Sequence, residues 1–145
     1  MPTLLDMAKR VVAGELQQPP IAQLLGAKLT AIEAGKARIE LAADERLANP
    51  MGTLHGGVLC DIADAAMGLA YAATLDEGES FTTLELKINF LRPVWRATLT
   101  AEGTVVQKGR TVGLTECSIT DEKGRLVARA TSTCLTLRGD QASGR

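Results

Sequence analysis

Hydrophobic and polar residues alternate along this chain with two different periods. Residues 4–16 place apolar side chains three and four positions apart, which predicts an amphipathic helix. Residues 21–25 predict a further helical turn that Gly26 closes. Beyond this point the dominant period is two, as in residues 36–43, where every second side chain is apolar. The pattern predicts β-strands at residues 28–33, 36–43, 81–92, 97–102, 111–120 and 126–137.

One stretch, residues 58–75, is apolar on nearly all of its faces. Its length approaches that of a membrane span. However, it contains Asp61 and Asp64, and each carboxylate near a bilayer centre costs about 2.5–3.5 kcal/mol. We therefore expect a helix of about 27 Å that is buried in protein. One flat sheet cannot cover such a helix, so either the sheet curls around it or a second subunit covers its open side.

These elements predict an α+β fold in which about six antiparallel strands pack on one long helix. The length of 145 residues suits a single domain. We assign residues 26–138 to this domain, residues 1–25 to a helical segment packed on it, and residues 139–145 to a disordered tail.

Composition excludes several classes of function. The chain has one histidine and three cysteines without a CxxC pair, so neither a metal site nor a redox dithiol is expected. The cysteines are predicted to be free core residues, most clearly Cys60, in a cytoplasmic protein. A net charge of −1 argues against a nucleic-acid partner. No long apolar run lies in the first twenty residues, so we expect neither a signal peptide nor a membrane partner.

The candidate chemistry lies where a polar, turn-rich loop meets the long helix. Gly56 and Gly57 allow close approach to the backbone, and the first N–H groups of a helix can polarise a carbonyl. Asp61 and Asp64 lie one helical turn apart, and a carboxylate in apolar surroundings is a stronger base. Each feature also has a structural explanation: Asp61 can complement the helix dipole, the glycines can allow tight packing, and His55 can be a structural donor. Buried carboxylates without a partner or function are nevertheless rare.

These residues resemble a known family. The matching positions are Asn49, Gly52, His55, Gly56, Gly57 and Asp64, followed by Thr83, residues 90–93 and residues 108–110. Together they look like the hot-dog-fold acyl-CoA thioesterases of the phenylacetate-pathway (PaaI-like) type, over residues 26–137. The resemblance implies that a curved sheet wraps the helix. It also implies that two subunits join to form the sites, in a homodimer or a dimer of dimers.

The resemblance also implies a role for each matching residue. Asp64 would be the nucleophile or general base, and the Gly56 N–H would be the oxyanion donor. Asn49 would orient the thioester or water, and His55 would support the loop. Thr83 of a neighbouring subunit would position water, although strand alternation places Thr83 on the face opposite Leu84 and Leu86.

The implied substrate is an acyl-CoA with an aromatic (phenylacetyl-like) or short- to medium-chain acyl group, and no metal or redox cofactor is implied. The basic residues Arg92, Lys108 and Arg110 are candidates to hold the CoA phosphates. Two other functions remain open. One is a hot-dog enoyl-CoA hydratase or dehydratase that uses His55 and Asp64, and the other is a non-catalytic acyl-CoA-binding module.

Overall fold

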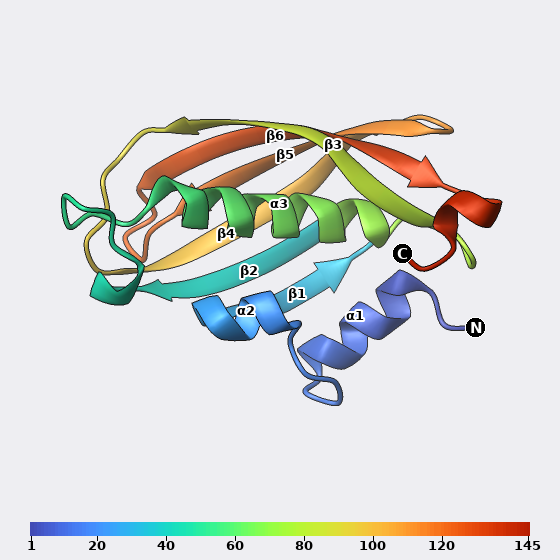
Figure 1. The fold of residues 1–145 in the computed structure, drawn as a ribbon, viewed down its shortest axis with the longest axis horizontal. Helices are drawn as coiled ribbons and strands as arrows, with labels where there is room; N and C mark the ends of the chain where they lie inside the picture. The colour runs from blue at the N-terminus through green and yellow to red at the C-terminus, as the bar shows by residue number, and fades with distance from the viewer.

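One long helix crosses the concave face of a curved antiparallel sheet, and two shorter helices lie along one sheet edge (Figure 1). This computed structural model describes every residue from Met1 to Arg145, with strand order β1-β2-β4-β5-β6-β3. The helices are α1 (Leu4–Val12), α2 (Pro20–Leu25) and α3 (Gly56–Ala72). The strands are β1 (Ala27–Glu33), β2 (Lys36–Ala43), β3 (Ser80–Phe90), β4 (Ala97–Lys108), β5 (Val112–Thr120) and β6 (Leu126–Leu137). The predicted α+β class and hot-dog arrangement are confirmed.

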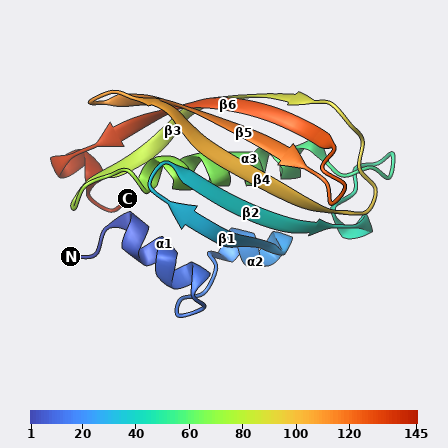
Figure 2. The same cartoon turned by 180° about the vertical axis from the view of Figure 1, so that it is seen from behind.

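Small residues let α3 approach the sheet closely. Ala63 and Ala66 of α3 are completely buried. Gly103 of β4 lies directly under the helix, because a Cβ built there would stand 2.3 Å from the carbonyl oxygen of Ala66. Gly113 of β5 makes similar room for the ring of Tyr71, at 2.4 Å from a built Cβ. No helix covers the opposite, convex face of the sheet (Figure 2).

A β-bulge in β3 changes which side chains face the helix. Thr83 pairs with Cys134 and Glu85 with Thr133, so Leu84 has no partner on β6. A bulge places two residues opposite one and shifts the alternation by one position. Before the bulge the odd-numbered Thr83 faces inward toward α3. After the bulge the even-numbered residues Leu86 and Ile88 face inward instead. Leu84, predicted on the same face as Leu86, is instead 55% exposed.

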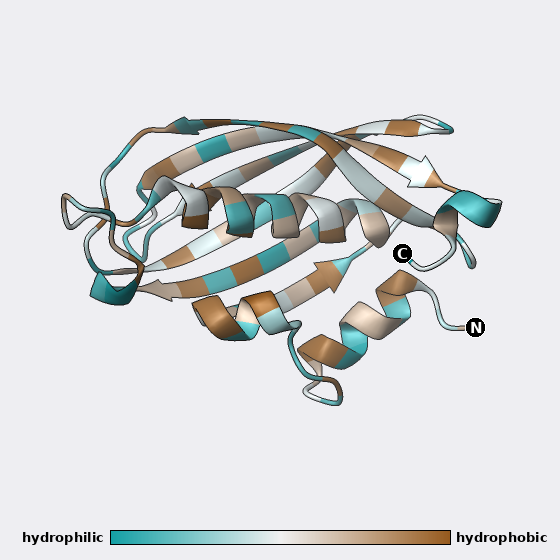
Figure 3. Ribbon diagram, in the orientation of Figure 1, coloured by the Kyte–Doolittle hydropathy of each residue, from teal (hydrophilic) through white to brown (hydrophobic).

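The N-terminal helices α1 and α2 pack against β1 at the edge of the sheet. Both helices carry apolar residues (Figure 3). Thr3 and Asp6 form a capping box at the start of α1. The helix ends at Val12, earlier than the predicted residue 16, and Gly14 follows with a φ of +78°. No helix of the structure combines the length and the apolar character that a membrane span requires.

The C-terminal residues differ from the expected disorder. A short 3-10 helix spans Gly139–Ala142. Arg138, immediately before it, donates hydrogen bonds to Glu79 at 2.6 Å and to the carbonyl oxygen of Arg110 at 2.7 Å. These contacts attach the start of the tail to the sheet.

Candidate active site

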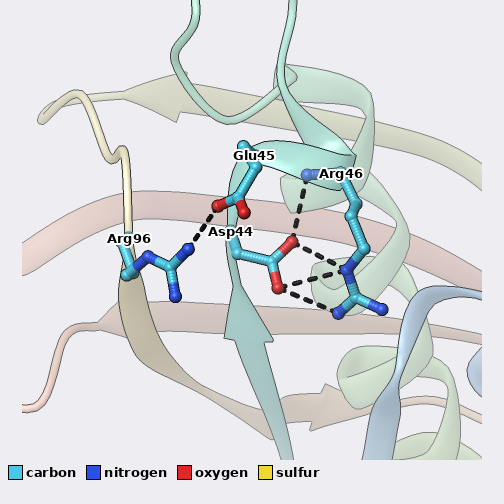
Figure 4. A network of polar contacts seen from close by, with 4 residues as sticks. All are labelled: Asp44, Glu45, Arg46 and Arg96. Atoms are coloured by element: carbon cyan, nitrogen blue, oxygen red, sulfur yellow. Dashed lines mark hydrogen bonds and ion pairs between the residues drawn. The ribbon is translucent and has the colours of Figure 1, made fainter.

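Charged side chains anchor the start of the loop that leads from β2 to α3 (Figure 4). Asp44 accepts a hydrogen bond from the Arg46 backbone N–H at 3.0 Å, and its carboxylate pairs with the Arg46 guanidinium at 2.9 Å. These hydrogen bonds hold the pKa of Asp44 below its ordinary value. Arg96, between β3 and β4, pairs with the neighbouring Glu45. The network fixes the direction in which the chain leaves β2.

Asn49 closes the tip of the same loop with its side chain. Its Oδ1 accepts hydrogen bonds from the N–H groups of Met51 at 2.9 Å and Thr53 at 3.2 Å. Its Nδ2 donates to the Thr53 hydroxyl at 2.8 Å. An asparagine amide has two N–H donors, so one remains for a further partner. That Asn49 orients the thioester or water stays a prediction. Such a role would use the second Nδ2 hydrogen.

His55 caps α3 and thereby leaves one backbone donor free. Its Nδ1 accepts a hydrogen bond from the Gly57 N–H at 2.8 Å, and its carbonyl oxygen accepts from Val58. The N–H of Gly56, the first helical residue, has no acceptor in the loop or the cap. This group lies at the positive end of the helix dipole. It is therefore suited to polarise a carbonyl group.

Contacts within the chain explain both glycines of the His-Gly-Gly sequence. A Cβ at position 56 would stand 3.0 Å from the ring of Phe90, and one at position 57 would stand 2.8 Å from His55 Nδ1. A larger residue would thus disturb either the ring of Phe90 or the helix cap. Sequence reasoning missed the role of Phe90, because its contact with Gly56 joins distant parts of the chain.

Asp64 and Thr83 form a direct hydrogen bond at the open face of α3. The Thr83 hydroxyl donates to Asp64 Oδ1 at 2.9 Å. The second carboxylate oxygen has no protein partner, and the Asp64 side chain forms no ion pair. The β3 bulge turns Thr83 toward Asp64 of its own chain. The resemblance implied that Thr83 of a neighbouring subunit positions water, and this contribution stays a prediction.

Asp61 shares this region with Asp64. Both line a shallow hollow beside β3 and an apolar cavity of about 630 Å³ that extends beneath α1. Burial, with a smaller effect from the charge of Asp64, raises the pKa of Asp61. The helix begins at Gly56, so Asp61 lies beyond the first turn, where the dipole effect has faded. The expectation that Asp61 complements the dipole is therefore not supported.

Replacing Asp61 by asparagine is expected to raise the melting temperature at pH 7. A carboxyl whose pKa is raised by folding contributes less stability as the pH rises from its ordinary pKa of 3.8 through the folded value. Asparagine removes this penalty and keeps the side-chain size. Thermal unfolding of both proteins at pH 7 and at about pH 3 measures the effect, which should shrink at the lower pH. An unchanged or lower melting temperature at pH 7 contradicts the assignment.

The predicted CoA-binding cations do not form one cluster. Arg92 lines a hollow with Asn49 and Gly56 at the start of α3. Lys108 donates to the carbonyl oxygen of Thr74 at 2.8 Å, beyond the other end of the helix. The backbone of Arg110 accepts a hydrogen bond from Arg138. Of the three, only Arg92 lies beside a candidate site residue.

The remaining residues with metal-binding or reactive side chains do not form a cluster. No group of three or more His, Cys, Asp or Glu side chains is placed to hold a metal ion. The three cysteines are free, as predicted. Cys117 and Cys134 are buried, but Cys60 is only partly buried and borders the hollow beside Asp61. The expectation that Cys60 is the clearest core residue is therefore wrong.

The two groups with the most suitable chemistry lie far apart in one chain. Gly56 and Asp64 are eight residues apart on one helix, a separation of about 12 Å along its axis. Both groups would have to lie within hydrogen-bonding or bonding distance of one carbonyl to act on it together. One chain therefore carries two separate parts of a site: the hydrogen-bond donor at Gly56 and the carboxylate of Asp64.

The chain is similar to proteins of known family. Residues 51–128 match the model of the thioesterase superfamily. A protein of Saccharolobus solfataricus is 37% identical over 118 residues, which cover 81% of this chain and 84% of that one. The proofreading thioesterase EntH of Klebsiella pneumoniae is 33% identical, over 70% of this chain and 74% of its own. The structure of the PaaI protein from the phenylacetic acid degradation operon of E. coli has a TM-score of 0.82 at 24% identity. It covers 94% of this chain and 98% of its own, and shows the same fold.

Proposed function

Since this chain belongs to the thioesterase superfamily, we propose that it hydrolyses the thioester of an acyl-CoA to the free acid and CoA. The acyl group is aromatic (phenylacetyl-like) or a short to medium aliphatic chain. The observation that carries the assignment is the hydrogen bond from Thr83 to Asp64. It orients one carboxylate oxygen and leaves the other free beside an apolar cavity.

Asp64 can act in thioester hydrolysis by either of two routes. As a general base it takes a proton from water, whose oxygen attacks the thioester carbonyl carbon. The oxyanion that forms is stabilised by a Gly56 N–H, and its collapse breaks the C–S bond. The CoA thiolate then takes the proton from Asp64. As a nucleophile, Asp64 attacks the same carbon and expels the thiolate, and water then cleaves the mixed anhydride.

Either route needs two subunits, because Gly56 and Asp64 of one chain are about 12 Å apart. We propose a homodimer, which can associate further into a dimer of dimers. Each site takes Asp64 and Thr83 from one chain and the Gly56 N–H from its partner. Strand β3 lies at the edge of the sheet, with Leu84 and Phe90 each 55% exposed. An open edge of this kind is a ready surface for a second chain.

The CoA phosphates need cationic partners outside the reacting centre. We propose Arg92 as the first of these, because it forms no ion pair and lines the hollow beside Gly56. Lys108 and Arg110 are weaker candidates, because both lie toward the other end of the fold. No metal or redox cofactor takes part in the proposed reaction, and CoA enters as part of the substrate.

The direct test is release of free CoA thiol from a panel of aromatic and aliphatic acyl-CoA esters. We expect hydrolysis of at least one class. Absence of thiol release across the panel would overturn the function. The same reaction mixtures can be examined for hydration of an enoyl-CoA. Hydration without thiol release would favour the hydratase alternative, although the structure uses His55 Nδ1 to cap the helix.

Mixed dimers provide a test of the shared site. Asp64→Asn removes the carboxylate, and Gly56→Pro removes the N–H at the first helical position, where no helical hydrogen bond is lost. Because the proline would press on the ring of Phe90, circular dichroism and the oligomeric state must first show that this variant folds and assembles. Each variant alone should be inactive. After subunit exchange about one quarter of the wild-type activity should return, because half of the dimers are mixed and each has one intact site. No recovery, with exchange verified, contradicts a site built from two chains.

A further inference from the structure

An apolar cavity of about 630 Å³ lies beneath the N-terminal helix, and the reaction mechanism assigns it no role. Its size falls within the ~300–1,000 Å³ of ordinary ligand pockets. The roof is one face of α1, formed by Leu4, Met7, Ala8 and Val11, which recur at helical spacing. The floor and walls come from β1, β2, the segment from Leu16 to Ala22, and α3 from Asp61 to Ala72. Of the roof residues only Ala8 belongs to the buried main core.

The cavity runs from the candidate nucleophile toward the far end of α3. Asp61 and Asp64 lie at one end of its α3 wall, and Ala72 lies at the other. Eight residues separate Asp64 from Ala72, so this wall extends about 12 Å along the helix. Leu4 lines the cavity and also packs against the buried cluster around Tyr71 and Leu75, which closes this end. A group bound at Asp64 can thus extend lengthwise beneath α1.

Few polar groups line the cavity compared with its apolar residues. Gln17 and Lys28 are exposed at its outer side. Gln18 Oε1 accepts a hydrogen bond from the backbone N–H of Leu29 at 3.1 Å. Apart from the two carboxylates, the rest of the lining is aliphatic, with Phe81 as the single aromatic ring. A hydroxyl deep in such a site would lose its hydration without a partner, which is unfavourable.

We propose that this cavity holds an unsubstituted aliphatic acyl chain of medium length, and that α1 limits the length accepted. The inference rests on the proposed thioesterase function and selects one of its two acyl classes. The thioester lies at Asp64, and the chain extends along α3 beneath Met7 and Ala8. Hydroxylated aryl groups are disfavoured, because away from the two carboxylates and the Gln18 amide the inner lining offers no hydrogen-bond partner.

The first test compares kcat/KM for straight-chain acyl-CoA esters of increasing length with hydroxybenzoyl-CoA. We expect a maximum at medium length, at least about ten-fold above the hydroxylated aryl ester. A preference for the aryl ester overturns the proposed occupant but leaves the thioesterase function intact. Failure to hydrolyse any ester overturns the function itself. The two failures are therefore distinguishable.

The second test alters the roof. Ala8→Phe fills the cavity and should lower kcat/KM about ten-fold more for the longest substrates than for the acetyl ester. Val12→Phe is the matched control, because Val12 lies on the same helix outside the cavity lining. Met7→Ala enlarges the cavity with little risk to folding, since Met7 is 45% exposed, and should shift the optimum to longer chains. Length profiles identical to the wild type in both roof variants overturn the proposal.

Discussion

Asp64→Asn is expected to lower kcat for acyl-CoA hydrolysis by about 10²–10⁴-fold, the range of catalytic acid–base residues. An amide can neither accept the proton from water nor attack a thioester carbonyl. The substitution keeps the size of the side chain, and its Oδ1 can still accept the hydrogen bond from Thr83. The fold should therefore persist. Steady-state kinetics together with circular dichroism separates lost chemistry from lost structure.

Two further substitutions are controls for the Asp64→Asn result. Thr83→Val removes one hydrogen bond from the carboxylate but keeps its charge, so the loss in kcat should be much smaller than for Asp64→Asn. Asp61→Asn makes the same chemical change one helical turn away, and should retain most of the activity. Full activity in Asp64→Asn, or a greater loss in Asp61→Asn, would show that the carboxylate has been assigned wrongly.

Gly103→Ala is expected to destabilise the protein by about 3 kcal/mol, at the upper end of ordinary overpacking effects. The new Cβ would stand 2.3 Å from the carbonyl oxygen of Ala66 and 2.7 Å from the backbone nitrogen of Met67. No side-chain rotation can relieve contacts with backbone atoms, so α3 would have to move away from the sheet. Such a movement would loosen packing along the helix.

Denaturant-induced unfolding measures this effect. Gln107→Val, at an exposed position of the same strand, is the control and should change the free energy of unfolding by no more than about 0.5 kcal/mol. A Gly103→Ala protein as stable as this control would mean that the helix and sheet are less tightly packed than the structure indicates.

The sequence predicted features that depend on local periodicity. The strict alternation in residues 36–43 matched β2, and the long apolar stretch matched α3 to within a few residues. Asp61 and Asp64 share a face because their spacing is close to one helical turn. The family resemblance added the wrapped helix, and it implied Thr83 as a site residue, although from a neighbouring subunit.

Features that depend on contacts between distant segments could not be predicted in this way. The bulge at Leu84 interrupts an alternation that is continuous in the sequence, because it arises from pairing with β6. Lys108 appeared available for phosphate, but its ammonium group is engaged by the carbonyl of Thr74, 34 positions away in the chain. The cavity beneath α1 likewise exists only once an N-terminal helix packs beside α3.

The bulge in β3 also allows residues at an odd spacing to share one face of the strand. Thr83 faces Asp64 before the extra residue, whereas Leu86 and Ile88 pack on the core after it. A regular strand of the same length would place Thr83 and Leu86 on opposite faces, so that either the threonine or the apolar pair would turn outward. Loss of Leu84 would instead close the bulge and leave both groups facing inward. The spacing between the site and the core along β3 thus tolerates removal of the extra residue, but not a regular strand of the present length.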